Sequence, residues 1–351
     1  MDIVKIEFFN ANAMQMLLRH NGLDFQTKQQ LQKYFKRREN GNRVTTLYNF
    51  CKDYASKSIG RLYVAHGLGL VGFSREVRNA LADGLYWDID MVNCHAVILN
   101  QLCKKHGWNC EGLTHYVDNR DEVITDVMNH YGCSYKDAKN LMIRLMFLGH
   151  PEAWVGDSVC ESFTHHLPYI EGLKEELNHI ASNVWSSYPN VSSVVARKKK
   201  KTQQAKIASC LSLVLQSEEH QILMAIDNSM TKQGRSMDTF IFDGGLVRRS
   251  KDETELPETI LRQCEEDVKQ NTNYDIRLVV KELKTTFQKD DNDDGLVPSN
   301  IIVDDLYAAK EFVKMMGERM VYTDDDLYVF DETTGLWNNK NHHCPNNHDT
   351  N

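Results

Sequence analysis

The sequence predicts an α+β fold that is rich in helices and contains a small antiparallel sheet. Amphipathic patterns with a period of about 3.6 residues recur along the chain and predict the helices. Two short apolar runs, residues 86–92 and 239–247, have strand character instead, and each carries a carboxylate, Asp90 and Asp243. Two glycines follow Asp243 between apolar runs, which predicts the turn of an antiparallel hairpin.

Composition indicates a folded intracellular protein. The 351 residues are 41% hydrophobic and 26% charged with only 6 prolines, which excludes a largely disordered chain. No apolar run reaches the roughly 18 residues of a membrane span, and the N-terminus lacks the pattern of a secretory signal. The 9 cysteines are scattered and odd in number, which indicates reduced thiols. We therefore expect no membrane partner.

The chain has a formal net charge of -8, but its charged residues are distributed unevenly along the sequence. Acidic residues crowd the final third of the chain, whereas residues 197–201 form a basic run. We expect Lys198, Lys199 and Lys200 in this run to contact nucleic-acid phosphates, although a solvated loop explains the run equally well. A short basic run also matches a nuclear-localisation pattern, so the compartment stays open between cytoplasm and nucleus.

The predicted elements suggest five segments. The first is a helical subdomain with amphipathic helices near residues 25–35 and 47–54. The fourth begins after a polar acidic linker and contains a helix near 306–316 and a hairpin over 327–337. In order, the segments are residues 1–57 (helical subdomain), 58–288 (main domain), 289–300 (linker), 301–340 (a further region) and 341–351 (a disordered tail).

Within the main domain, most elements are bounded by recognisable caps or turns. Ser134 has capping-box spacing and opens a helix whose apolar and basic side chains lie on opposite faces, with Lys136, Lys139 and Arg144 on the basic one. The expected order is a strand at 60–64, a helix after Ser74, the strand at 86–92, helices at 97–107, 119–131 and 134–149, helical turns over 160–190, a long helix at 203–230, the hairpin around Asp243, and a strand at 275–280.

Asp90 and Asp243 are candidate ligands for magnesium. Mg²⁺ prefers oxygen ligands and is commonly held by one or two carboxylates together with substrate phosphates. Asp88 and Asp90 point to the same face of their strand, and two neighbouring carboxylates need a compensating cation, donor or water. Each Asp has a simpler explanation, as a turn residue or on a solvated edge strand. A zinc set of Cys103, His106, Cys110 and His115 is a weaker alternative because its spacing is loose.

The ordered motifs resemble those of family A DNA polymerases. Residues 60–63 are similar to their Gly-Arg-Leu segment, and Asp137 through Gly149 resembles the helix that binds the incoming triphosphate. More closely, the chain resembles the transposon–virus polymerase family, in which a diverged polymerase domain is commonly fused to a superfamily 3 primase-helicase. The segments that carry this resemblance are DIDMVNCHAVIL (88–99), AKNLMIRLMFLG (138–149) and FIFDGGLV (240–247).

The resemblance implies a polymerase-like right hand whose antiparallel palm sheet carries the two catalytic Asp residues. It implies template-dependent nucleotidyl transfer with two Mg²⁺, or Mn²⁺, held by Asp90 and Asp243, with Asp88 as an acidic neighbour. The partners would be primer–template or single-stranded DNA, nucleoside triphosphates, and a superfamily 3 helicase in cis or in trans, within a virus or mobile element. The triphosphate would contact Lys139, Lys136, Arg144 and His95, and the nucleic acid Arg61, Arg75 and Arg78.

Two other functions remain open. An Asp-x-Asp pair, a nearby His and a later strand Asp also describe archaeo-eukaryotic primases, although no good Ser-x-His strand lies between the acidic strands. A catalytically inactive polymerase-like module that binds DNA or docks a helicase is the third candidate. The absence of a helicase motor motif from the chain suggests a fragment, a split gene product, or a polymerase that acts without its own motor.

Overall fold

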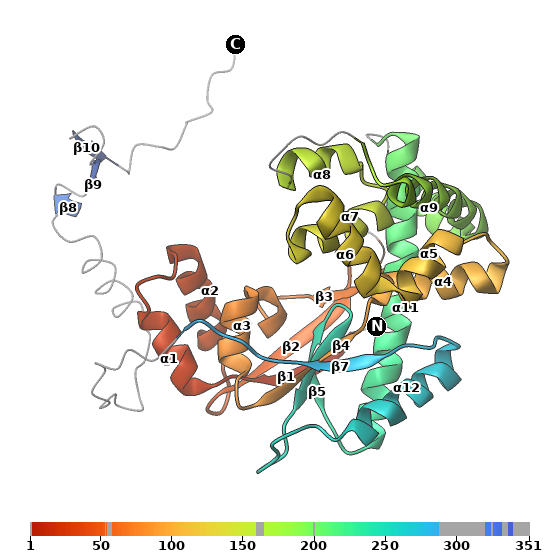
Figure 1. Cartoon of the computed structure of the whole chain (residues 1–351). Coiled ribbons are helices and arrows are strands. Elements are labelled where there is room, and N and C mark those ends of the chain that lie inside the picture. Colours follow the sequence, from red (N-terminus) through yellow and green to blue (C-terminus); the bar gives the residue numbers. More distant parts are fainter. Residues whose placement is uncertain are drawn as a thin grey trace. The chain divides into compact units, whose positions relative to one another are not determined.

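The computed structural model confirms an α+β protein (Figure 1). It divides into two units, Met1–Gln288 and Lys289–Asn351, which are described separately below. The residues described are 2–52, 54, 58–158, 165–198, 201–287, 320–323, 326–331 and 336–339.

The N-terminal part of the first unit contains a sheet as well as helices. The antiparallel strands β1 (Ile3–Phe8), β2 (Arg43–Phe50) and β3 (Leu62–Val64) are ordered β1-β2-β3, and α1 (Ala11–Arg19) and α2 (Phe25–Lys36) connect β1 to β2. The helix predicted over residues 47–54 is therefore wrong. Burial alternates along β2 with a period of 2, and its Thr and aromatic residues suit a half-buried strand.

A second antiparallel sheet carries both candidate carboxylates. Its order is β5-β6-β4-β7, with β5 (Met237–Ile241), β6 (Gly244–Arg248), β4 (Tyr86–Met91) and β7 (Leu278–Lys281). Asp90 on β4 lies opposite Gly244 on β6, which confirms the predicted hairpin and brings it beside the Asp90 strand. A Cβ atom at Gly244 would lie 1.9 Å from the Ile89 carbonyl oxygen, so only glycine permits this approach.

Helices α11 (Gln203–Lys232) and α12 (Glu258–Thr272) run beside this sheet, and most of the other helices gather in a group on one side of it (Figure 1). The longest, α11, contacts α4, α9, α10, α12 and β5, and therefore ties the helical part to the sheet. No described helix has the length and apolar character needed to cross a membrane. The other helices are α3 (Arg75–Ala82), α4 (Cys94–His106), α5 (Glu111–Asp118), α6 (Arg120–Tyr131), α7 (Tyr135–Met146), α8 (Pro151–Ser158), α9 (Pro168–Ser187) and α10 (Pro189–Ala196).

Several predicted helix boundaries are confirmed by their caps. The Ser134 side chain accepts a hydrogen bond from the Asp137 backbone N–H and begins α7, as its capping-box spacing predicts. Gly107 and Gly132 end α4 and α6 in the left-handed conformation, which glycine adopts without steric cost.

The second unit contains one described sheet of antiparallel strands ordered β10-β9-β8. These are β8 (Met320–Thr323), β9 (Asp326–Asp331) and β10 (Leu336–Asn339), and the β9–β10 pair confirms the hairpin predicted over 327–337. The predicted linker at 289–300, the helix at 306–316 and the tail at 341–351 lie outside the described residues. The division into five segments stays a prediction.

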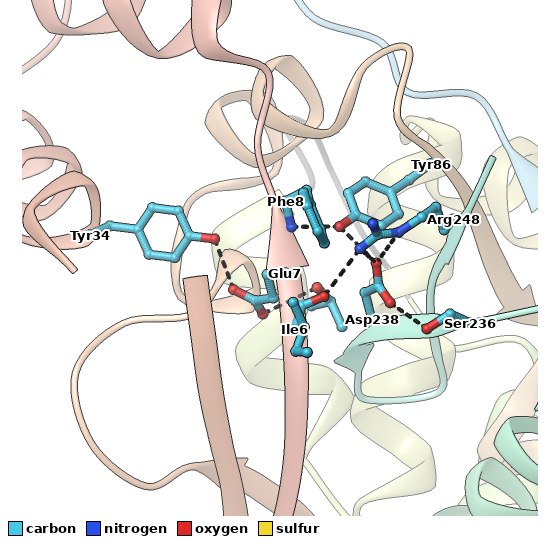
Figure 2. Close-up of polar contacts among 9 residues, drawn as sticks. Ile6, Glu7, Phe8, Tyr34, Tyr86, Ser236, Asp238 and Arg248 are labelled. Carbon is cyan, nitrogen blue, oxygen red and sulfur yellow. Dashed lines mark hydrogen bonds and ion pairs between the residues drawn. The ribbon is translucent and has the colours of Figure 1, made fainter. Parts of the chain in front are cut away.

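Buried polar contacts join β1 to the β5–β6 hairpin (Figure 2). Asp238, only 3% exposed, accepts hydrogen bonds from Arg248, Tyr86 and Ser236. The Tyr86 hydroxyl lies 2.7 Å from the Phe8 backbone nitrogen and accepts its hydrogen bond. Charged groups that are buried need such partners, so this network fixes the position of the hairpin that carries Asp243.

Glu7 on β1 is a second buried carboxyl, and removal of one of its hydrogen-bond donors should measurably destabilise the fold. It accepts a hydrogen bond from the Tyr34 hydroxyl at 2.9 Å (Figure 2) and another from the Leu70 backbone N–H at 2.9 Å. Burial raises the pKa of Glu7, although these hydrogen bonds oppose the rise.

Tyr34→Phe removes one donor to Glu7 and should lower the free energy of unfolding by about 1–2 kcal/mol in urea denaturation. Tyr63→Phe, at an exposed position, is the matched control and should change it little.

Candidate active site

Asp90 and Asp243 line the same cavity, which has a volume of about 220 Å³. Asp90 lies near the end of β4, and Asp243 occupies the turn between β5 and β6. Phe242 adopts a left-handed backbone conformation at φ 50° before Asp243, and the Met91 N–H donates a hydrogen bond to the Asp243 carbonyl at 3.0 Å. The turn is thus held against β4, and the two carboxylates come from adjacent strands.

The opposite side of the cavity is formed by helices. Helix α7 contributes Lys139 and an apolar surface, and α6 contributes Arg120 at its first residue. The Arg120 guanidinium donates a hydrogen bond to the Tyr135 hydroxyl at 3.2 Å. Lys139 has no hydrogen-bond or ion-pair partner within the described part of the chain. The full lining is Arg61, Asp90, Met91, Asn93, Cys94, His95, Ala96, Tyr116, Arg120, Lys139, Met142, Ile143, Met146, Phe147, Asp243 and Lys281.

Burial and neighbouring negative charge raise the affinity of the Asp243 carboxyl for protons. Burial, followed by the negative charges of Asp90 and Glu219, raises the pKa of Asp243 to about 6. Lys281 on β7 forms an ion pair with Asp90 and offsets part of this negative charge. The Asp243 carboxyl therefore lies in a locally negative environment that a bound cation would relieve.

Glu219 on α11 organises a cluster of charged side chains beside the carboxylates. It is 1% exposed and accepts two hydrogen bonds from Arg61, each 2.6 Å long, in a two-pronged ion pair. The same carboxylate lies 2.6 Å from His95 Nε2. Burial by itself would raise the pKa of Glu219, but the hydrogen bonds from His95 and Arg61 outweigh it and lower the pKa.

Aromatic rings complete the environment of Arg61 and His95. The Arg61 guanidinium lies over the Phe242 ring, 4.9 Å from its centroid. The His95 ring meets the Phe147 ring edge to face, at a centroid distance of 5.4 Å. These contacts bring together the residue that precedes β3, helix α4, the β5–β6 turn and the end of α7.

The cavity contains five of the residues that the sequence singled out: Asp90, Asp243, Lys139, His95 and Arg61. Their assignments to metal, triphosphate or nucleic acid stay predictions. The structure nevertheless brings them together from segments up to about 180 residues apart in the sequence, which the order of motifs alone does not require.

Other predicted site residues lie outside the cavity lining. Asp88 is 8% exposed, and burial raises its pKa, while Lys281 and then Arg78 lower it. Arg75 also acts on Asp88, so Arg75 and Arg78 on α3 contribute charge beside Asp88. Lys198 donates a hydrogen bond to the Tyr54 hydroxyl. The remaining residues are Lys136 and Arg144 on α7, outside the lining, and Lys199 and Lys200, which lie outside the described residues.

Sequence reasoning missed three charged residues of the site: Glu219, Lys281 and Arg120. Glu219 could have been found, because a spacing of four and three residues places it on the same apolar face of α11 as Leu215 and Ile222. A carboxylate on such a face needs a partner. Lys281 gave no comparable signal, since its partner Asp90 lies on a distant segment. Arg120 gave none either, because its position at the cavity depends on how the helices pack.

The donor atoms decide which metal suits each cluster. Asp90 and Asp243 offer carboxylate oxygens, which fit Mg²⁺ or Mn²⁺. Donor atoms of Cys94, His95 and Glu219 lie within 4.8 Å of one another, but Arg61 already holds Glu219, and burial raises the pKa of the Cys94 thiol. Among the described residues, the predicted zinc set of Cys103, His106, Cys110 and His115 forms no group of donors at ligand distance, so that alternative is wrong.

The raised pKa predicts that Asp243 destabilises the metal-free protein at neutral pH. Its carboxyl has a pKa of about 6 when folded and about 3.8 when unfolded. The folded state therefore binds more protons between these values, and stability is lost as the pH rises through that window. Asp243→Asn should raise the free energy of unfolding by about 2 kcal/mol at pH 7.5 in EDTA. The gain should disappear near pH 4, and an equal gain at both pH values would contradict this explanation.

A viral protein shares detectable similarity with nearly the whole chain. It is described as "Putative helicase V13" of the Sputnik virophage and is 29% identical over 96% of this chain and 43% of its own length. The chain thus spans less than half the length of this relative. No protein-family model matches the chain.

Proposed function

We propose that this protein catalyses template-dependent nucleotidyl transfer, as a DNA polymerase or primase-like enzyme in the replication of a virus or mobile element. The observation that carries the proposal is the shared cavity in which Asp90 and Asp243, from adjacent strands, face Lys139 on α7. A pair of carboxylates on a rigid sheet opposite a cationic helix suits a reaction in which negative charge develops on phosphates.

The carboxylates would hold two divalent cations, Mg²⁺ or Mn²⁺. When bound, such ions supply charge stabilisation for both the attacking and the leaving oxygen. Asp90 and Asp243 suit this role because β4 and the hairpin fix their backbones. Asp88, buried outside the lining, would act on the site through its charge.

The helical wall would bind the triphosphate. Lys139 lies in the cavity without a partner among the described residues, and Arg120 lies near it, so the two cations could bind anionic oxygens. The sequence assigned this role to Lys139, Lys136 and Arg144, and the cavity lining favours Lys139 together with Arg120.

Arg61 and His95 would position the substrates on the side nearest Phe242. Glu219 fixes both side chains, so each presents its remaining surface to the cavity with little loss of conformational freedom on binding. The nucleic-acid partner would be primer–template or single-stranded DNA. A superfamily 3 helicase, in cis or in trans, is the expected protein partner, and the longer virophage relative described as a helicase supports it.

Extension of a labelled primer tests the proposal. The purified protein is incubated with nucleoside triphosphates and Mg²⁺ or Mn²⁺ on primed and unprimed templates. We expect template-directed extension that EDTA abolishes. Products on unprimed template would favour a primase, including the archaeo-eukaryotic type. A lack of products with either metal, together with retained DNA binding, would contradict nucleotidyl transfer.

A DNA-binding or helicase-docking module without catalysis is the second candidate. The Lys281–Asp90 ion pair favours it, because an ammonium already balances one of the two carboxylates. The virophage relative described as a helicase is consistent with such a role. In that case, DNA binding should survive EDTA and should be unaffected by Asp90→Asn, whereas a polymerase should lose extension under both conditions.

A further inference from the structure

Lys281 is the cation closest to the candidate metal ligands, and nothing in the sequence pointed to it. It ends β7, the edge strand of the β5-β6-β4-β7 sheet. Its backbone lies opposite Asp88, but its ammonium forms an ion pair with Asp90 Oδ2. The Lys281 side chain is 40% exposed, whereas that of Asp90 is 17% exposed.

The other cationic side chains around the cavity bind other partners or do not form an ion pair with Asp90. Arg61 binds Glu219 through two hydrogen bonds, and Arg120 binds the Tyr135 hydroxyl. Within the described part of the chain, Lys281 is the only cation paired with Asp90. Without a divalent cation, it is therefore Lys281 that balances this carboxylate.

One carboxylate oxygen cannot bind an ammonium and a divalent cation at the same position. The Lys281 side chain is partly exposed and stands at the last residue of β7, so its flexible stem can move into solvent without disturbing the core. The buried Asp90 strand, in contrast, is fixed between β6 and β7.

We propose that Lys281 is a resident counterion of the carboxylate site, which holds Asp90 in the metal-free protein and leaves Asp90 Oδ2 when a divalent cation binds. Metal binding is then an exchange of one cation for another. Lys281 stabilises the metal-free site and lowers its affinity for metal. The inference depends on the proposed function only in taking Asp90 as a metal ligand.

Titration with Mn²⁺, followed by the electron paramagnetic resonance signal of the free ion, tests this exchange without any activity measurement. Lys281→Met should lower the Kd for Mn²⁺ by about three- to tenfold, as expected for loss of a partly exposed competing ion pair and its charge. Lys281→Arg keeps the charge and should stay near the native Kd. Lys284→Met is the matched control, because Lys284 lies on the same segment but pairs with Glu282 at 3.1 Å.

The melting temperature in EDTA provides a second readout. Lys281→Met should lower it, and saturating Mn²⁺ should restore it to the native value. In an Asp90→Asn background the same substitution should lower it clearly less, because the ion pair is gone and only the weaker attraction of Lys281 to Asp88 and Asp243 remains. An unchanged or weaker Mn²⁺ affinity in Lys281→Met would overturn the proposal, as would an equal loss of melting temperature in both backgrounds.

The test also separates this inference from the proposed function. Tighter Mn²⁺ binding without any primer extension would contradict nucleotidyl transfer and support the exchange. Normal extension with an unchanged Mn²⁺ affinity in Lys281→Met would support nucleotidyl transfer and contradict the exchange of cations.

Discussion

Asp90→Asn is expected to lower the rate of primer extension by about 10³-fold or more. The substitution keeps the size of the side chain but removes the negative charge that would hold a divalent cation in the cavity. The ion pair with Lys281 is lost as well, so the Asn variant should still fold, with Lys281 released to solvent. Single-turnover extension with saturating triphosphate measures the effect on the chemical step.

Asp88→Asn is the matched control for this substitution. It makes the same chemical change two residues away on β4, at a carboxylate outside the cavity lining. We expect its loss of activity to be at least tenfold smaller than that of Asp90→Asn. Equal losses would mean that Asp88 is also a ligand, and full activity of Asp90→Asn would contradict the catalytic assignment.

Glu219→Gln has the second-largest expected effect, a loss of about 10²-fold in kcat/KM. Glu219 fixes Arg61 and His95 through contacts of 2.6 Å, and an uncharged amide cannot accept all of them. Displacement of catalytic-site groups by about 1 Å is enough for a loss of this size. Steady-state extension, with triphosphate and primer–template varied in turn, shows which substrate is affected.

Glu218→Gln, on the next residue of α11, is the control for Glu219→Gln. Glu218 interacts with Tyr274 and Lys105, whereas Glu219 interacts with His95 and Arg61. Loss of the buried Glu219 charge also risks a lower melting temperature. If the effect were only structural, activity would recover at a temperature far below melting. We expect the deficit to persist there, because it arises from the positions of Arg61 and His95.

Local sequence signals predicted much of the fold. The caps at Ser134 and Gly107, the glycines after Asp243 and the spacing of apolar residues are all properties of short segments, and the corresponding helices and hairpin are present. The error over residues 47–54 has the same origin. Leu47, Phe50 and Tyr54 fit a helical spacing, but pairing with β1 and β3 makes residues 43–50 a strand.

The residues of the site were predictable only where the local sequence around a residue indicates its chemical role. Asp90 and Asp243 stand out as carboxylates in apolar runs, and Lys139 lies on a helix with a basic face. Lys281 and Arg120 are ordinary surface-type cations in the sequence, and only the order of strands and the packing of helices bring them to the cavity. Glu219 has a signal in its position on the apolar face of α11, although Glu218 beside it gives the pair the look of a solvated acidic stretch.

A crystal structure with Mn²⁺ and a non-hydrolysable nucleoside triphosphate, with anomalous scattering recorded at the manganese edge, tests the central claim most directly. We predict two anomalous peaks about 3.5–4 Å apart, in contact with Asp90 and Asp243, with the triphosphate extending toward Lys139. Lys281 should then no longer contact Asp90. The absence of manganese from these carboxylates, or a peak at Cys94, His95 and Glu219 instead, would contradict the two-metal site proposed for this protein.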